Sequence, residues 1–130
     1  MLKQASTLLL TTRRIPQLYY GTEIMMNGIK SKSDGYVRKD FPGGWADDKE
    51  TALTAEGRSK IQNDCYNFYK TILNWRKGNN VIAKGSMTQF MVQNGVYAYA
   101  RQYEGKIVFV MLNGTDSENH RSFKNSTKKF

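Results

Sequence analysis

The region that most constrains the fold of this chain lies near its C-terminal end. Beyond Asn80 the pattern changes to a period of two in residues 87–92 and 96–103, and a third short segment, residues 107–112, is apolar throughout. The separators are Gln93-Asn94-Gly95 and Glu104-Gly105, and both are typical of tight β-hairpin turns. Period-two alternation between such turns predicts an antiparallel three-stranded meander.

One face of the expected middle strand carries four large side chains: Tyr97, Tyr99, Arg101 and Tyr103. Successive side chains of a strand point to opposite faces, so these four lie together. We expect this face to pack against further strands of the same sheet. The alternative is a platform on which a sugar ring stacks.

Residues 58–77 are predicted to form a helix. Apolar residues recur there at steps of three and four and draw one stripe: Ile61, Cys65, Phe68, Ile72 and Trp75. Ser59 followed by Gln62 fits a capping box at the helix start. We expect the stripe to be core, with Cys65 acting as a small hydrophobe rather than a nucleophile.

The first half of the chain is less regular. Residues 2–13 show helical periodicity, whereas Ile15–Tyr20 is a short, aromatic apolar run that favours a buried strand, with Pro16 near its start. Tyr19 and Tyr20 are expected to pack in that strand. Thr22–Ala52 holds five Gly or Pro residues and no sustained period, which predicts a long loop of the kind that is usually functional or disordered.

Composition excludes several classes of protein. With 39% hydrophobic and 12% aromatic residues, the chain has enough to bury and is not a disordered tail. The single cysteine, Cys65, excludes a disulfide framework, and the single histidine, His120, leaves no basis for a His-based triad or metal cluster. The longest apolar runs, residues 8–10 and 107–112, are too short to span a membrane, so no membrane partner is expected.

The chain is basic, with 20 Lys and Arg against 11 Asp and Glu and a net charge of +9. Such a balance suggests nucleic acid, because cations that neutralise phosphates release counterions. However, residues 21–50 hold five positive and six negative side chains, and the other positive charges are thinly spread. No nucleic-acid partner is therefore predicted.

Two segments resemble a known family. Ile15-Pro16-Gln17-Leu18-Tyr19-Tyr20-Gly21-Thr22-Glu23 is similar to the eighth-strand signature of the α-amylase family of glycoside hydrolases. Residues 38–45 (Arg-Lys-Asp-Phe-Pro-Gly-Gly-Trp) resemble the following loop in its neopullulanase, cyclomaltodextrinase and maltogenic-amylase branch. Residues 74–77 and 95–99 resemble the end of the last barrel helix and a strand of the C-terminal β domain. The sequence departs from the family at Arg14, where Gly is usual.

The resemblance implies a fold and an activity. As an isolated piece the chain is expected to be α+β, with residues 1–79 forming the last β/α unit of a (β/α)8 TIM barrel. Residues 80–130 would begin an antiparallel β-sandwich C-terminal domain and end in a polar tail from Thr115. The family cleaves α-1,4-glucans or cyclodextrins by a retaining mechanism that uses two carboxyl groups. In the family those groups lie on barrel strands that precede this region.

No catalytic residue is therefore assigned here, and the chain alone is expected to be inactive. No cofactor is expected either. Some family members bind structural calcium, but no calcium or other metal site can be assigned in this sequence.

The resemblance also implies a substrate-binding role for the loop after Tyr20. Asp34 and Arg38 match the spacing of a family Asp and Arg pair that grips sugar hydroxyls, although the two residues could instead pair with each other. Trp45 could stack on a sugar ring or plug the loop that carries it. Glu23 is expected to have a structural hydrogen-bonding role.

Two other functions stay open: a stand-alone carbohydrate-binding module that uses Trp45 and the tyrosines, and a basic, Tyr-rich β-sheet that binds single-stranded nucleic acid. The preferred partner is an α-glucan oligosaccharide or cyclodextrin bound by a parent enzyme.

Unpaired strand edges at Ile15–Tyr20 suggest self-association. The sequence has no clear signal peptide, and it leaves cytoplasm and periplasm both open for the parent.

Overall fold

The computed structural model describes residues 1–118, which form a small α+β structure. The elements in chain order are α1 (Leu2–Thr11), η1 (Thr22–Ile24), η2 (Asp34–Tyr36), α2 (Lys60–Lys77), α3 (Asn80–Lys84), β1 (Ser86–Gln93), β2 (Val96–Tyr103) and β3 (Lys106–Asn113), where η marks a 3₁₀ helix. They divide between two compact units. The sheet unit combines Met1–Ile15 with the chain from Asn74 onward, and the loop unit is Pro16–Leu73. The division predicted near residue 79 stays a prediction.

The three strands form one antiparallel sheet in the order β1-β2-β3, which confirms the predicted meander. Both hairpins turn through two residues with positive φ: 49° and 73° at Asn94 and Gly95, and 47° and 73° at Glu104 and Gly105. Turns of this hand match the twist of the flanking strands. In the register, Tyr99 of β2 pairs with Gln89 of β1 and Val110 of β3.

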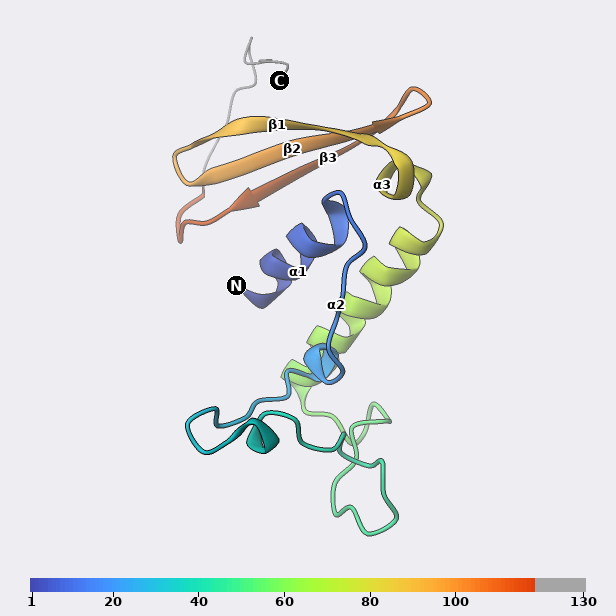
Figure 1. Ribbon diagram of the computed structural model, residues 1–130, viewed down its shortest axis with the longest axis vertical. Coiled ribbons are helices and arrows are strands. Elements are labelled where there is room, and N and C mark those ends of the chain that lie inside the picture. The colour runs from blue at the N-terminus through green and yellow to red at the C-terminus, as the bar shows by residue number, and fades with distance from the viewer. Residues whose placement is uncertain (119–130) are drawn as a thin grey trace. The chain divides into compact units, whose positions relative to one another are not determined.

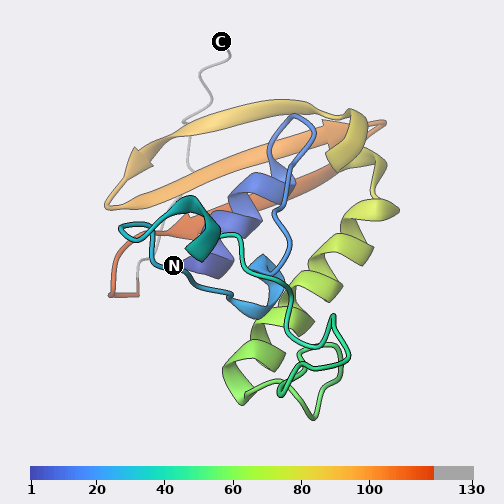
Figure 2. The ribbon, with the colours of Figure 1, turned by 60° about the horizontal axis from the view of Figure 1, so that its bottom comes forward.

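Within the sheet unit, α1 lies along one face of the sheet, and α3 packs at the end of β2 (Figures 1 and 2). The covered face is the one that carries Tyr99 and Arg101, both fully buried. The Tyr99 and Thr11 hydroxyls are hydrogen-bonded to each other across this interface. The expectation that further strands cover this face is therefore wrong, because helices of the same chain occupy it.

Arg101 is the largest fully buried side chain, at 1% exposure. Its guanidinium donates to four carbonyl oxygens: those of Thr11 at 2.9 Å, Ile82 at 2.8 Å, Gly85 at 2.8 Å and Ser86 at 3.3 Å. These acceptors come from the end of α1, from α3 and the residue after it, and from β1. One side chain of β2 thus ties the end of α1 to the continuous stretch that runs from α3 into β1.

Two more arginines lie near this buried cation. Arg76, in the last turn of α2, donates to the carbonyl oxygens of Leu10, and of Arg14 at 3.3 Å. Burial lowers the pKa of Arg101, and the charges of Arg13 and Arg76 lower it further. The carbonyl end of α1 offsets part of this repulsion, because a helix C-terminus carries partial negative charge.

Helix α2 begins with the predicted capping box. The Ser59 backbone N–H donates to Gln62 Oε1 at 2.8 Å, and the Gln62 N–H donates to Ser59 Oγ at 3.3 Å. The predicted apolar stripe is only partly core. Cys65 is buried, but Ile61 is 66% and Trp75 is 42% exposed, because the packed face of the helix turns toward Tyr69 instead.

The strand predicted at Ile15–Tyr20 is not formed. The segment has neither helical nor strand structure, and no strand in residues 1–118 pairs with it. A strand needs a ladder of backbone hydrogen bonds from a neighbour, and side-chain pattern alone does not supply one. Ile15 is 96% exposed, and Tyr19 and Tyr20 are also exposed rather than packed. The barrel unit and the self-association through its edges therefore remain predictions.

No helix in the described residues has the length and apolar character needed to cross a membrane. The predicted polar tail falls largely outside the described residues, and so does His120.

Candidate functional site

The loop after Tyr20 is held by short-range turns. Gly21, with φ of 81°, starts it, and its carbonyl oxygen accepts from Ile24 N at 3.2 Å and Met26 N at 2.9 Å. Ile24 is fully buried and anchors η1. The Tyr20 hydroxyl donates to the Lys39 carbonyl oxygen at 2.7 Å, which brings the far side of the loop back to its start.

The Tyr20 hydroxyl stays protonated to higher pH than usual. Its side-chain interaction with Tyr19 raises the pKa of Tyr20, with smaller contributions from desolvation and from Asp40. The geometry thus gives Tyr20 the role of a hydrogen-bond donor to the loop backbone.

Asp34 begins η2, and its carboxylate forms an ion pair with Lys30 rather than with Arg38. Arg38 has no ion pair within residues 1–118, and both candidate side chains are exposed. The alternative in which Asp34 and Arg38 pair with each other is therefore not what the structure has. A surface ion pair is worth little free energy, so Lys30 does not prevent Asp34 from accepting other hydrogen bonds.

Trp45 stands on a compact turn organised by Asp48. The Asp48 Oδ2 atom accepts from the backbone N–H of Gly43 at 2.7 Å and of Trp45 at 3.1 Å. Gly43 has φ of 89°, and a Cβ there would lie 2.2 Å from Thr51 Oγ1, so the turn requires glycine. The Trp45 side chain is 64% exposed and does not plug the loop.

These three residues share one loop but not a closed cavity. In the described chain, no hydrogen bond, ion pair or ring contact joins Trp45 to Asp34 or Arg38. The arrangement offers a carboxylate, a guanidinium and an indole to solvent, which is suited to binding and not to acid–base chemistry. Their roles in sugar binding remain predictions.

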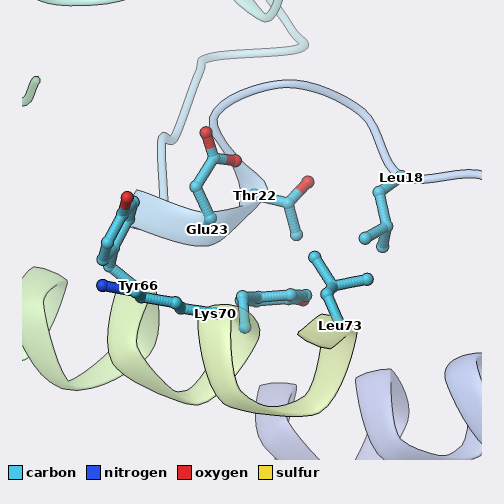
Figure 3. A pocket seen from close by; sticks show the side chains of 7 residues that line it. Leu18, Thr22, Glu23, Tyr66, Lys70 and Leu73 are labelled. Atoms are coloured by element: carbon cyan, nitrogen blue, oxygen red, sulfur yellow. The ribbon is translucent and has the colours of Figure 1, made fainter. Parts of the chain in front are cut away.

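A small pocket lies between η1 and α2 (Figure 3). Leu18 and Leu73 face each other across it, and Glu23, Tyr66 and Lys70 form its polar rim. Its volume of about 250 Å³ falls below the roughly 300–1,000 Å³ of typical ligand pockets, so we assign it no ligand. The structural hydrogen bond expected of Glu23 is not present among the described residues.

Tyr66 and Lys70 are not among the site residues predicted from the sequence. The sequence pattern that could have indicated them is a helical one. Tyr66, Lys70 and Leu73 recur at steps of four and three and so share a second face of the helix. Among the described residues, no group of three or more His, Cys, Asp or Glu side chains is placed to hold a metal ion.

Comparison with known proteins links this loop and sheet to one family. A family model for the cyclo-malto-dextrinase C-terminal domain matches residues 87–129. Alpha-amylase 3 of Dictyoglomus thermophilum is 29% identical over 142 residues, which cover 96% of this chain and 28% of that protein. A cyclomaltodextrin glucanotransferase of Thermoanaerobacterium thermosulfurigenes is 32% identical over 111 residues, or 85% of this chain and 13% of that protein.

The chain belongs to the α-amylase family. It corresponds to the C-terminal part of that family's enzymes, as the resemblance of its motifs indicated. A solved cyclomaltodextrinase shares the fold, with a TM-score of 0.64 at 22% identity over 85% of this chain and 17% of that one. The chain thus spans less than a third of the length of these α-amylase-family relatives.

Proposed function

We propose that this chain is the substrate-binding C-terminal portion of an α-amylase-type enzyme that acts on α-1,4-glucans or cyclodextrins. The observation that carries the proposal is the loop between Tyr20 and Ala52. The chain that contains this loop is similar to proteins named for amylase and cyclodextrin activities. Within the loop, the Trp45 side chain is exposed to solvent.

In this proposal the loop binds sugar hydroxyls with charged groups. Asp34 accepts hydrogen bonds and Arg38 donates them in a forked geometry, so the pair can divide adjacent hydroxyls between them. Trp45 offers an apolar ring face to the C–H face of a glucose unit. The exposure of all three side chains supports this role.

The proposal assigns barrel closure to Ile15–Tyr20. This segment is not helical, is unpaired among the described residues and is exposed at Ile15, which fits a strand that pairs with neighbours in a longer polypeptide. The nucleophile and general acid of the retaining reaction would come from that polypeptide. This chain supplies neither, so it binds glucan without cleaving it.

The test is a titration of the full chain with maltoheptaose and β-cyclodextrin, in a Trp75→Phe background where Trp45 is the only fluorescent indole. We expect a saturable change in emission and no release of reducing sugar. Asp34→Ala and Arg38→Ala should each weaken binding about tenfold, as expected for loss of a hydrogen bond to a charged group.

Lys30→Met is the matched control, because it removes the ion-pair partner of Asp34 and leaves the carboxylate in place. It should bind at least as well as the parent variant. A silent Trp45 would contradict the proposal, and so would hydrolysis by the chain alone. Binding that depends on Trp45 but not on Asp34 or Arg38 would favour the stand-alone carbohydrate-binding module.

A further inference from the structure

The sheet unit contains a second cleft, remote in sequence from the loop. It lies where α2 ends, α3 begins and the β2–β3 hairpin turns. The side chains that concern us are Trp75, Asn80, Tyr103, Glu104 and Lys106. Its volume of about 330 Å³ lies within the range of roughly 300–1,000 Å³ found for ligand pockets.

Hydrogen bonds fix both walls of this cleft. Asn79 caps α3 through Oδ1, which accepts from Val81 N at 3.1 Å and Ile82 N at 3.3 Å, and this sets the position of Asn80. On the other wall, Tyr103 and Lys106 are paired across the hairpin. The side chains are therefore presented from ordered segments.

The cleft combines two aromatic rings with polar groups. The Trp75 side chain is 42% exposed, and the Tyr103 ring has the Lys84 ammonium 5.8 Å from its centroid. Among the described residues, no hydrogen bond or ion pair occupies the side chains of Asn80, Glu104 or Lys106. An amide, a carboxylate and an ammonium thus remain available beside apolar ring surface.

The hairpin turn itself indicates selection for a carboxylate. Glu104 has φ of 47° at the first turn position, where Asn, Asp or Gly is favoured. The other hairpin of the sheet has Asn94 at the equivalent position, with φ of 49°. A Glu in this strained backbone conformation is better explained by its side chain in the cleft than by turn formation.

We propose that this cleft is a second α-glucan binding site, separate from the loop that carries Asp34, Arg38 and Trp45. A glucose unit has apolar C–H faces and a rim of hydroxyls. The rings of Trp75 and Tyr103 suit the faces, and Asn80, Glu104 and Lys106 suit the rim. The choice of ligand rests on the proposed function, which supplies the substrate class.

The experiment uses the full chain with Trp45→Phe, so that Trp75 is the only fluorescent indole. Titration with maltoheptaose should give a saturable change in Trp75 emission, and cellohexaose, which has β linkages, should not. In this background, Tyr103→Ala should weaken binding about tenfold, the loss expected for one contact of this kind.

Glu104→Asn is the variant that keeps the result interpretable. Asn is favoured in the turn, so the thermal midpoint should stay the same or rise while the affinity for maltoheptaose falls several-fold. Asn94→Asp in the other hairpin is the matched control and should leave affinity unchanged. Unaltered affinity in both Tyr103→Ala and Glu104→Asn would overturn the inference even if Trp75 responds.

The two sites fail separately. Silence of Trp75 together with a response of Trp45 in the Trp75→Phe chain would overturn the second site and leave the loop intact. A response of Trp75 with a silent Trp45 would remove the loop from the proposed function and leave the second site standing. Silence of both indoles would overturn both.

Discussion

The sheet unit and the loop unit are each stabilised internally by a different kind of hydrogen bond. In the sheet unit, the buried Arg101 donates to carbonyls as far as 90 residues away in sequence. In the loop unit, hydrogen bonds are mostly local, such as those from Gly43 and Trp45 to the Asp48 carboxylate. Long-range bonds to a buried group make folding cooperative, whereas local turns open one at a time. We therefore expect the sheet unit to unfold as a whole and the turns of the loop unit to open separately.

The largest effect should come from removing the hub of the sheet unit. Arg101→Met leaves four backbone carbonyl groups without their donor, and we expect a loss of about 3–5 kcal/mol in the free energy of unfolding. Urea unfolding followed by circular dichroism measures the loss, and amide exchange should show β2 losing protection. Arg101→Lys, which has no forked donor, should recover only part of the stability. A fully stable Arg101→Met chain would show that the sheet unit has no such hub.

A smaller effect, with a pH signature, is expected at Tyr99. Burial holds the pKa of Tyr99 above its usual 10.0. The folded state therefore keeps this proton at pH values where the unfolded chain loses it. The resulting stability is present below the unfolded pKa and is lost as pH rises from there toward the folded pKa.

Tyr99→Phe should lose about 1 kcal/mol at neutral pH, with its hydrogen bond to Thr11, and should flatten the decline in stability above about pH 10. Urea unfolding of both chains at a series of pH values measures the difference. If the stability of the wild-type and Tyr99→Phe chains declined in parallel with pH, Tyr99 would have the same pKa in the folded and unfolded states. Thr11→Val keeps the tyrosine but removes a hydrogen bond that lowers its pKa, so the decline should be retained in full and should extend to higher pH.

The capping box of α2 lies in the loop unit and should matter less. Ser59→Ala removes the side-chain acceptor for the Gln62 N–H and should cost about 1 kcal/mol. Ser59→Asp retains an acceptor and should be close to wild type. Thermal unfolding measures both, and equal stability of the Ala and Asp variants would show that solvent replaces the cap.

The smallest global effect is expected at the Trp45 turn. Asp48→Ala removes the acceptor shared by Gly43 and Trp45, but the turn is exposed, so the free energy of unfolding should change by about 0.5 kcal/mol or less. Local exchange of those two amides should nevertheless accelerate. Asp48→Asn, which keeps one oxygen, should retain part of the protection. A large global loss would show that the loop unit folds as cooperatively as the sheet.

Local signals predicted part of this structure well. The turns at Asn94-Gly95 and Glu104-Gly105 and the capping box at Ser59 each depend on residues close in sequence, and all three are present. The strand predicted at Ile15–Tyr20 does not form in the described residues. A strand needs a partner strand for its backbone hydrogen bonds, and the side-chain pattern of the segment does not show whether one is present. The hub role of Arg101 was missed for a related reason, since its acceptors come from segments that the strand pattern does not connect.

For the candidate site, the sequence located the loop and its exposed residues but not their contacts. The ion pair of Asp34 with Lys30 has the same four-residue spacing as the alternative with Arg38, so spacing alone does not choose between them. The cleft at Trp75 needed three elements to be placed together. Neither helical nor strand periodicity in the sequence predicts which elements pack together to form a cleft.

The hydrogen bond from Arg76 to the Arg14 carbonyl oxygen has a consequence for how this chain can evolve. The backbone departs from the sheet unit beside Arg14 and rejoins it near Arg76, and these two points are fastened to each other. The chain between Arg14 and Arg76 is therefore a loop whose two ends are joined by this hydrogen bond. The entropic cost of closing a loop rises only slowly with its length. Insertions and deletions between residues 15 and 73 are therefore expected to accumulate without changing the register of the strands in the sheet unit.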